Sequence, residues 1–418
     1  MKNILNMPRK IAETRINKSI CPEGLDSVMI VVTLALLCLG LVMVASASIT
    51  VADRQIGSPF YYLYRQTGAA ALGLIAVFVV ANIRLVHWEK SGMALLGFAF
   101  FLLLIVLIPG IGKTVNGSTR WIPMGILNLQ VSELVKLFLL IYVAGYLVRH
   151  GDEVRSSVWG FIKPMVMVGL ACVLLLLEPD FGASVVIMIT ALGMMFLGGV
   201  RFVQFISFLG LFGAVASLLV YSSPYRLQRL TTFVNPWADP FDSGFQLTQS
   251  LIAIGSGGLT GTGIGGSVQK LFYLPEAHTD FVFAIMAEEL GLLGVVMVIG
   301  LFAVLLFRSF MLARKAEQYG NQFSAYLAYG IGIWLGLQAF INIGVNMGVL
   351  PTKGLTLPLI SYGGSSLIVC CAAIGLLLRI SYECGGAGQA MPKSGRKTLS
   401  AAGMKSKQTI KSLLEDAA

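Results

Sequence analysis

Residues 273–306 read YLPEAHTDFVFAIMAEELGLLGVVMVIGLFAVLL, a polar loop that leads directly into a long apolar run. The run from Asp280 to Leu306 is long enough to cross a bilayer as a helix, which needs about 20 residues. An ionisable residue at the threshold of such a span is a candidate functional residue, because a charge near lipid is costly. Asp280 is therefore the first candidate catalytic residue of this chain.

The rest of the sequence repeats this apolar pattern. The chain has 418 residues, of which 56% are hydrophobic and only 12% charged, whereas about a quarter of the residues of a soluble domain are charged. We therefore predict an all-α integral membrane protein with about ten transmembrane helices and a large outer loop between the seventh and the eighth. The predicted spans are approximately 28–48, 67–83, 93–110, 133–149, 161–177, 181–199, 203–221, 280–306, 324–349 and 357–379.

Lysines and arginines are distributed unevenly between the predicted loops. Most fall on one side of the membrane if the N-terminus is cytoplasmic, which is the usual bias. Both termini are therefore predicted to be cytoplasmic, and the net charge of +10 reflects topology rather than nucleic-acid binding. We divide the chain into a cytoplasmic segment (1–25), a membrane domain (26–382) with a large periplasmic loop (222–279), and a flexible cytoplasmic tail (383–418).

Cysteine and histidine usage argues against two kinds of site. The six cysteines all fall in predicted spans or on the inner side, so none can form a disulfide in an outer loop. The three histidines have no metal-site spacing. In the outer loop, Gly261, Gly263 and Gly266 form a G-x-G-x-x-G pattern, but no strand precedes it, so it does not predict dinucleotide binding. Tight turns are expected there, or a backbone cradle for an anion.

Several polar residues lie inside the predicted spans. Glu133 and Lys136 are three residues apart and can meet on one helix face, either as a structural ion pair or in contact with substrate. Gln338, Asn342 and Asn346 recur at spacings of four, so they share a face. They form either hydrogen bonds between helices or the polar wall of a cavity. The small residues 363–366 permit close helix contact or contact a substrate.

Acidic residues occur at two further places. Glu178 and Asp180 flank Pro179 in a short outer turn, where they are either simple exposed carboxylates or groups that orient a sugar or hold a divalent cation. Glu288 and Glu289 lie deeper than Asp280 on the same span, and a cation such as Lys136 would compensate one of them.

Asp280 itself has an alternative role. Thr279 or Asp280 could cap the helix that follows and complement its positive end. A helix end would lower the pKa of Asp280 and keep its carboxylate ionised.

The strings SELVK, EPDFG, NPWADPF, LPEAHTDF and LPLISYGGSS occur in this order. On these residues the chain resembles the SEDS (shape, elongation, division and sporulation) family of peptidoglycan glycosyltransferases over about residues 28–380. KLFYL and LPEAH are similar to the division branch rather than the elongation branch.

The resemblance implies polymerisation of lipid II, an undecaprenyl-pyrophosphate disaccharide-pentapeptide, with Asp280 as the catalytic general base. It implies an enzyme of the bacterial inner membrane at the division septum, whose partners are a class B penicillin-binding protein and other divisome proteins. A lipid II flippase and a scaffold remain alternatives. The cofactor is either none or a divalent cation, Mg or Mn. The candidate substrate-binding residues are Arg120, Glu178, Asp180, Arg226, Arg229, Lys270, His278 and Lys353.

Overall fold

The computed structural model describes residues 24–390, apart from 116–117, 125–126 and 272. Within this part of the chain, nine helices are long and apolar enough to cross a membrane. A further apolar helix, α6 (Phe181–Leu197), has 17 residues. The nine are α1 (Ser27–Ile56), α2 (Tyr61–Asn82), α3 (Leu85–Val106), α4 (Val131–Ser156), α5 (Val158–Leu177), α7 (Phe202–Tyr221), α10 (Val282–Gln318), α11 (Gln322–Asn346) and α12 (Gly364–Ala390). The predicted helical membrane architecture is confirmed.

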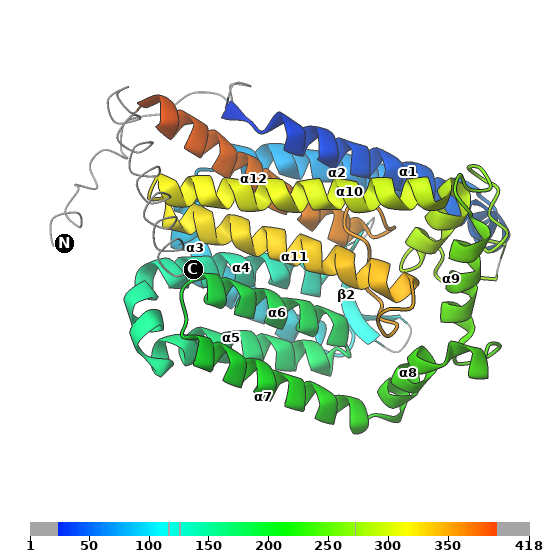
Figure 1. Cartoon of the computed structure of the whole chain (residues 1–418), viewed down its shortest axis with the longest axis horizontal. Helices are drawn as coiled ribbons and strands as arrows, with labels where there is room; N and C mark the ends of the chain where they lie inside the picture. The colour runs from blue at the N-terminus through cyan, green and yellow to red at the C-terminus, as the bar shows by residue number, and fades with distance from the viewer. Residues whose placement is uncertain (1–23, 116–117, 125–126, 272, 391–418) are drawn as a thin grey trace, which may run out of the picture.

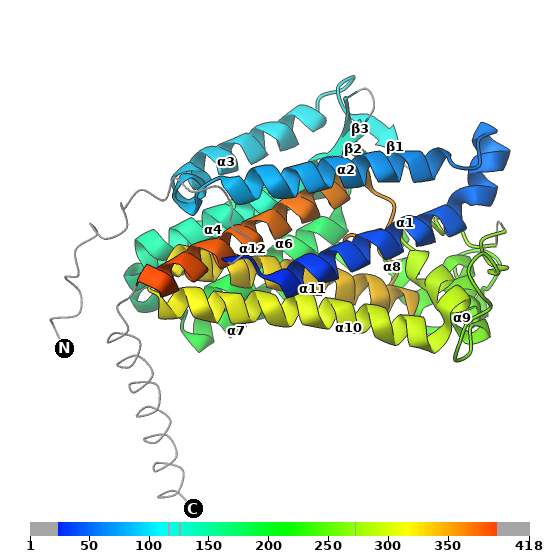
Figure 2. The same cartoon turned by 90° about the horizontal axis from the view of Figure 1, so that it is seen from above.

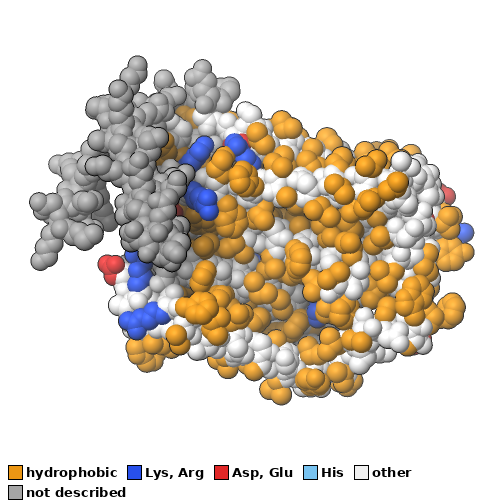
Figure 3. Space-filling view, viewed as in Figure 1, with side chains coloured by type: hydrophobic (Ala, Val, Ile, Leu, Met, Phe, Trp, Pro, Cys, Tyr) orange, Lys and Arg blue, Asp and Glu red, His pale blue; other side chains and the backbone are white. Residues whose placement is uncertain are grey.

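The helices form one bundle along a common direction (Figure 1). α4 packs against α3, α5, α6 and α11, while α2 lies along α12, as Figure 2 also shows. α7 lies at the edge of the bundle, and none of its described residues is buried. Apolar side chains cover much of the visible surface (Figure 3), as expected where a bundle faces lipid rather than water.

The first and the last helix of the bundle have their terminal ends on the same side. The start of α1 and the end of α12 lie toward one end, opposite α8 (Pro224–Val234) and α9 (Phe245–Ser256). These two helices and the 3-10 turn η3 (Pro236–Ala238) lie within residues 222–279, the predicted large loop. The predicted terminal segments lie mostly outside the described residues, and α12 continues past the predicted boundary at 382.

A small antiparallel sheet was not predicted. Between α3 and α4, β1 (Lys113–Val115), β2 (Ser118–Met124) and β3 (Leu127–Gln130) pair in the order β1-β2-β3. An Asn-Gly pair at 116–117 is the sequence signal for such a hairpin. Ser365 at the start of α12 fastens the sheet, because its hydroxyl donates to Asn128 O at 2.6 Å and accepts from Gln130 N at 3.0 Å.

The helix that follows Asp280 is longer than predicted and is broken near its start. Gly291, in the first third of α10, has φ 65° and ψ −165°, a conformation that glycine adopts readily. The glycine-rich loop packs into this break: Thr262 N and Gly263 N donate to the carbonyls of Glu288 and Glu289, at 3.0 and 3.1 Å. These amides are engaged within the protein, so the G-x-G-x-x-G pattern here fastens a loop to α10.

Candidate active site

Asp280 lies in the loop that ends at α10, and its carboxylate is half-buried. The N-cap of α10 is Phe281, without a side-chain capping bond, so the capping role considered for Thr279 and Asp280 is wrong. Among the described residues no donor hydrogen-bonds to the Asp280 carboxylate. A β-carbon placed at Gly354 would lie 3.2 Å from Asp280 Oδ2, so the extended segment after α11 runs directly beside it.

Three amides on α11 hold this arrangement together. Asn342 and Asn346 each donate to the backbone carbonyl of Asp280, at 2.9 and 3.0 Å. Asn342 Nδ2 also donates to Leu355 O at 2.6 Å, and Gln338 Nε2 donates to Thr356 O at 3.0 Å. The polar stripe of α11 therefore fixes both the Asp280 loop and the neighbouring segment, which matches the hydrogen-bonding alternative rather than an open cavity wall.

The surroundings of Asp280 shift its acidity upward. Burial, and after it the Glu276 carboxylate, raise the pKa of Asp280 to about 7, against the lowering effect of the Arg229 and Arg120 guanidiniums. The prediction that a helix end lowers the pKa of Asp280 is therefore wrong, because Asp280 does not cap α10. A carboxylate with a pKa near neutrality is well suited to accept a proton from a substrate at physiological pH.

Arg120 on β2 joins the sheet to the turn between α5 and α6. Its guanidinium donates to the carbonyls of Glu178 and Pro179 and lies 3.8 Å from Asp180 Oδ1. Asp180 caps α6 by accepting from Ala183 N at 3.1 Å. Neither carboxylate is exposed as a simple turn residue would be, because Glu178 and Asp180 are 0% and 3% exposed.

Glu178 differs from Asp180 in its environment. Neither of its carboxylate oxygens has a hydrogen-bond partner among the described residues. Burial and the nearby Asp180 raise the pKa of Glu178 to about 8, while Arg120 lowers it. Glu178 and Asp180 are the only carboxylates predicted as ligands for a cation. No group of three or more His, Cys, Asp or Glu that could hold a metal ion occurs among the described residues.

The predicted cations fall into different environments. Arg229 on α8 donates to Thr352 O at 3.2 Å and lines a polar cavity of about 200 Å³ with Thr232, Ser243 and Gln246. Lys353 Nζ lies 4.1 Å from the centre of the Phe181 ring. Arg229 thus contacts the segment that carries Gly354, and Lys353 belongs to this segment. The side chain of Arg226 lies outside the described part of the structure.

His278 does not orient Asp280. Its ring lies between Tyr62 and Tyr362, with centroid distances of 4.5 and 5.5 Å, and its backbone carbonyl accepts from Tyr362 N at 2.9 Å. Burial lowers the pKa of His278, against the effect of Glu276, which favours the neutral imidazole. His278 therefore packs the loop against α2 and the start of α12.

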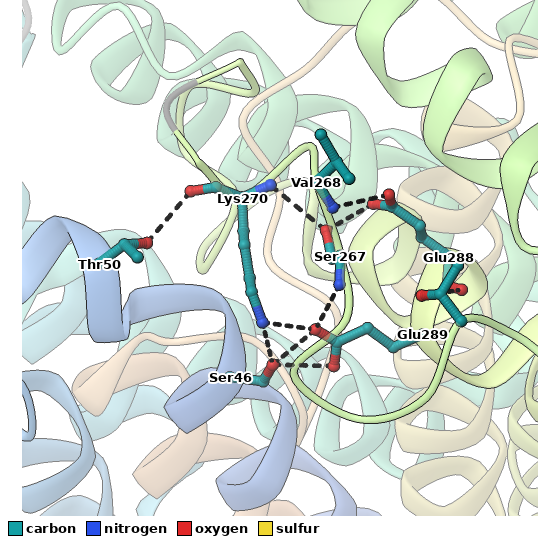
Figure 4. Close-up of polar contacts among 8 residues, drawn as sticks. Ser46, Thr50, Ser267, Val268, Lys270, Glu288 and Glu289 are labelled. Carbon is teal, nitrogen blue, oxygen red and sulfur yellow. Dashed lines mark hydrogen bonds and ion pairs between the residues drawn. The ribbon is translucent and has the colours of Figure 1, made fainter.

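The buried charges pair differently from expectation. Lys136 Nζ lies 2.8 Å from both Glu133 Oε1 and Gln338 Oε1, so it does not compensate the acids of α10. Instead, Lys270 Nζ lies 2.8 Å from Glu289 Oε1 (Figure 4). The spacing of Glu133 and Lys136 was enough to predict their pairing, whereas the partner of Glu289 is a loop residue 19 positions away that no periodicity identifies.

The sequence matches the cell cycle protein family that comprises FtsW, RodA and SpoVE, over residues 26–385. The chain belongs to this family. The FtsW/RodA/SpoVE match spans all the described helices, nearly to the end of α12, and includes every predicted site residue.

Its relatives are similar over nearly their whole length. The chain is 58% identical to the probable peptidoglycan glycosyltransferase FtsW of Thioalkalivibrio sulfidiphilus, over 86% of this chain and 90% of that protein. It is 56% identical to the probable peptidoglycan glycosyltransferase FtsW of Coxiella burnetii, over 88% and 98% respectively. These names agree with the division branch indicated by the sequence motifs.

Solved structures of the FtsW/RodA/SpoVE family share the fold. A chain from a structure describing coordination of polymerization and crosslinking by a peptidoglycan synthase complex aligns with a TM-score of 0.71 and 33% identity, over 86% of this chain and 98% of that chain. The rod shape determining protein RodA of Thermus thermophilus aligns with a TM-score of 0.65 and 31% identity, over 86% and 97%.

Proposed function

We propose that this chain is a peptidoglycan glycosyltransferase that polymerises lipid II, with Asp280 as the general base. One observation carries the mechanism: a half-buried carboxylate, with a pKa of about 7, lies in the field of Arg120 and Arg229 where a loop joins a membrane-spanning helix. A base must reach the proton it removes, and no protein donor occupies this carboxylate among the described residues.

The proposed reaction is a glycosyl transfer between two lipid II molecules. The 4-hydroxyl oxygen of one sugar attacks the anomeric carbon of a second lipid II while the Asp280 carboxylate takes the hydroxyl proton. The bond between the anomeric carbon and the phosphate oxygen breaks with inversion, and undecaprenyl pyrophosphate leaves with the electron pair. General base catalysis of this kind contributes about 10²- to 10⁴-fold to the rate.

The leaving pyrophosphate requires positive charge near the reacting centre. Arg120 and Arg229 are the best candidates, because both act electrostatically on Asp280, and Lys353 lies one residue from Gly354. A divalent cation, Mg or Mn, would be held by Glu178 and Asp180 together with the pyrophosphate, since Mg²⁺ commonly uses one or two carboxylates and substrate phosphates. When bound, it would neutralise charge on the leaving group.

We propose that the reaction takes place at the outer face of the inner membrane, at the division septum. Lys and Arg side chains gather toward the end of the molecule where α1 begins and α12 ends (Figure 3), and such an excess favours the cytoplasmic side. The start of α10, which Asp280 precedes by two residues, lies toward the other end, with α8 and α9 (Figure 1). A class B penicillin-binding protein and other divisome proteins are the proposed partners.

The flippase alternative rested on polar residues inside the spans. In the structure, Lys136 pairs with Glu133, and Gln338 binds both Lys136 and the segment after α11, so Lys136 and Gln338 are engaged within the protein. Lipid II transfer in proteoliposomes that exceeds transfer in empty liposomes, and that is lost in Gln338→Leu, would revive this alternative.

Gel analysis of lipid II polymerisation tests the enzymatic proposal. Purified wild-type chain with its transpeptidase partner is expected to form glycan strands, and Asp280→Asn is expected to form none while remaining folded and bound to the partner. A scaffold role without catalysis predicts instead that Asp280→Asn rescues a depletion strain.

A further inference from the structure

A buried polar network fastens the loop that leads to Asp280 (Figure 4). Lys270 Nζ lies 2.8 Å from Glu289 Oε1 on α10 and donates to Ser46 Oγ on α1 at 3.0 Å. Ser46 Oγ in turn lies 2.6 and 2.8 Å from the two carboxylate oxygens of Glu289. The Lys270 and Glu289 side chains are 5% and 0% exposed. Three elements therefore meet at one buried ion pair.

The second carboxylate of α10 binds the same loop. Glu288 accepts from Ser267 Oγ and, at 2.9 Å, from Val268 N. Ser267 N points to Glu289 Oε1 at 3.4 Å, and Thr50 on α1 donates to Lys270 O at 3.3 Å. Adjacent acids on α10 thus hold consecutive loop residues, and α1 closes the arrangement from the other side.

The energetics point to a positioning role. A buried ion pair is expensive to desolvate and gives little net stability, although removing one partner costs several kcal/mol. Such a pair is useful where it fixes one geometry. Here the loop from Lys270 to Asp280 is fixed at both ends, by this network and by the two asparagine amides that hold the Asp280 carbonyl.

We propose that Ser46, Lys270 and Glu289 are positioning residues that hold the Asp280 loop in its catalytic geometry. This inference rests on the proposed function of Asp280. It also reassigns Lys270, which was a candidate substrate-binding residue: its ammonium group is buried and donates to Glu289 and Ser46. The network acts on the reaction through the loop, without touching substrate.

The test compares Lys270→Met, Glu289→Gln and the double variant in the full chain with its transpeptidase partner. Each single substitution leaves a buried charge without its partner, so kcat for lipid II polymerisation per folded molecule is expected to fall about 10- to 100-fold, with KM nearly unchanged. The double variant is expected to lose no more than the worse single variant, because residues of one network are not additive.

Two further variants keep the test decisive. Ser46→Ala removes the hydroxyl contacts with Lys270 and Glu289 and leaves these two charges paired. It therefore tests the network if Lys270→Met fails to fold, and a several-fold fall in kcat is expected. Lys163→Met breaks an exposed lysine pair with Glu153 and is expected to leave kcat unchanged.

The outcomes separate three roles. Lower thermal stability with wild-type kcat per folded molecule would show that the network is only structural and would overturn the proposal. A raised KM with unchanged kcat would show that Lys270 contacts substrate, and would also overturn it. Asp280→Asn is measured in parallel. If Asp280→Asn polymerises lipid II normally, the proposed function fails. If Asp280→Asn is inactive while Lys270→Met keeps the wild-type kcat, only the positioning proposal is rejected.

Discussion

The side-chain amide of Asn346 donates to the backbone carbonyl of Asp280 at 3.0 Å, and Asn342 donates to the same carbonyl at 2.9 Å. The candidate base is thus held through its main chain by α11, which leaves its carboxylate available to substrate. The same asparagines reach Ala284 N and Leu355 O, so one helix sets the positions of the start of α10 and of the segment beside Asp280.

Substitution of these asparagines should impair catalysis. Asn346→Leu removes one of the two amide bonds to the Asp280 carbonyl and the bond that Asn346 Oδ1 accepts from Ala284 N, each worth about 0.5–1.5 kcal/mol. We expect kcat for lipid II polymerisation to fall at least tenfold, with lower thermal stability. Asn82→Leu, at an exposed amide that donates to Phe78 O, is the matched control. Equal activity of the two variants would contradict the role of Asn346 in holding Asp280.

The pH dependence of the rate should report Asp280. The base acts when deprotonated, so with a pKa of about 7 the rate is expected to rise with pH, from about one tenth of its maximum at pH 6 to about nine tenths at pH 8. Initial rates measured across this range check the prediction. A profile that is flat between pH 6 and 8 would contradict it.

Two substitutions should move that profile in opposite directions. Glu276 raises the pKa of Asp280, so Glu276→Gln is expected to shift the rising limb to lower pH. Arg229 lowers the pKa of Asp280, so Arg229→Gln is expected to shift the limb to higher pH and to reduce the rate through loss of leaving-group stabilisation. Shifts in the same direction for both variants would exclude Asp280 as the titrating group.

Any side chain at position 354 should reduce catalytic activity. A β-carbon there would approach Asp280 Oδ2 to 3.2 Å, so Gly354→Ala is expected to displace the carboxylate and lower kcat about tenfold or more, with little loss of stability. Gly97→Ala on α3, where a β-carbon would meet nothing within 4 Å, serves as the control. Wild-type kcat in Gly354→Ala would show that the carboxylate position is not critical.

The Glu133–Lys136 pair should matter for stability more than for chemistry. Lys136→Met leaves the Glu133 carboxylate buried, which typically costs about 3–5 kcal/mol, and a lower thermal unfolding temperature is expected. Adding Glu133→Gln should restore part of that loss, because no unpaired charge remains. If the double variant is less stable than Lys136→Met, the pair has another role.

The sequence was sufficient to predict what depends on local pattern. Apolar run lengths located the membrane helices, and the three-residue spacing of Glu133 and Lys136 predicted contact on one helix face. Contacts between distant segments were beyond such patterns: Lys270, rather than Lys136, approaches Glu289, and Gly354 approaches Asp280 across 74 positions. The upward shift of the Asp280 pKa likewise depends on burial of its side chain, which local sequence pattern does not reveal.

The comparison of wild-type chain with Asp280→Asn, each purified with the proposed penicillin-binding protein partner and supplied with lipid II, tests the general-base role most directly. Asn keeps the shape of the side chain but cannot accept the hydroxyl proton. We expect glycan strands from the wild type and from the control Asp152→Asn, at an exposed acid at the far end of α4, and no detectable strands from Asp280→Asn. Strands of normal length and rate from folded Asp280→Asn would contradict this mechanism.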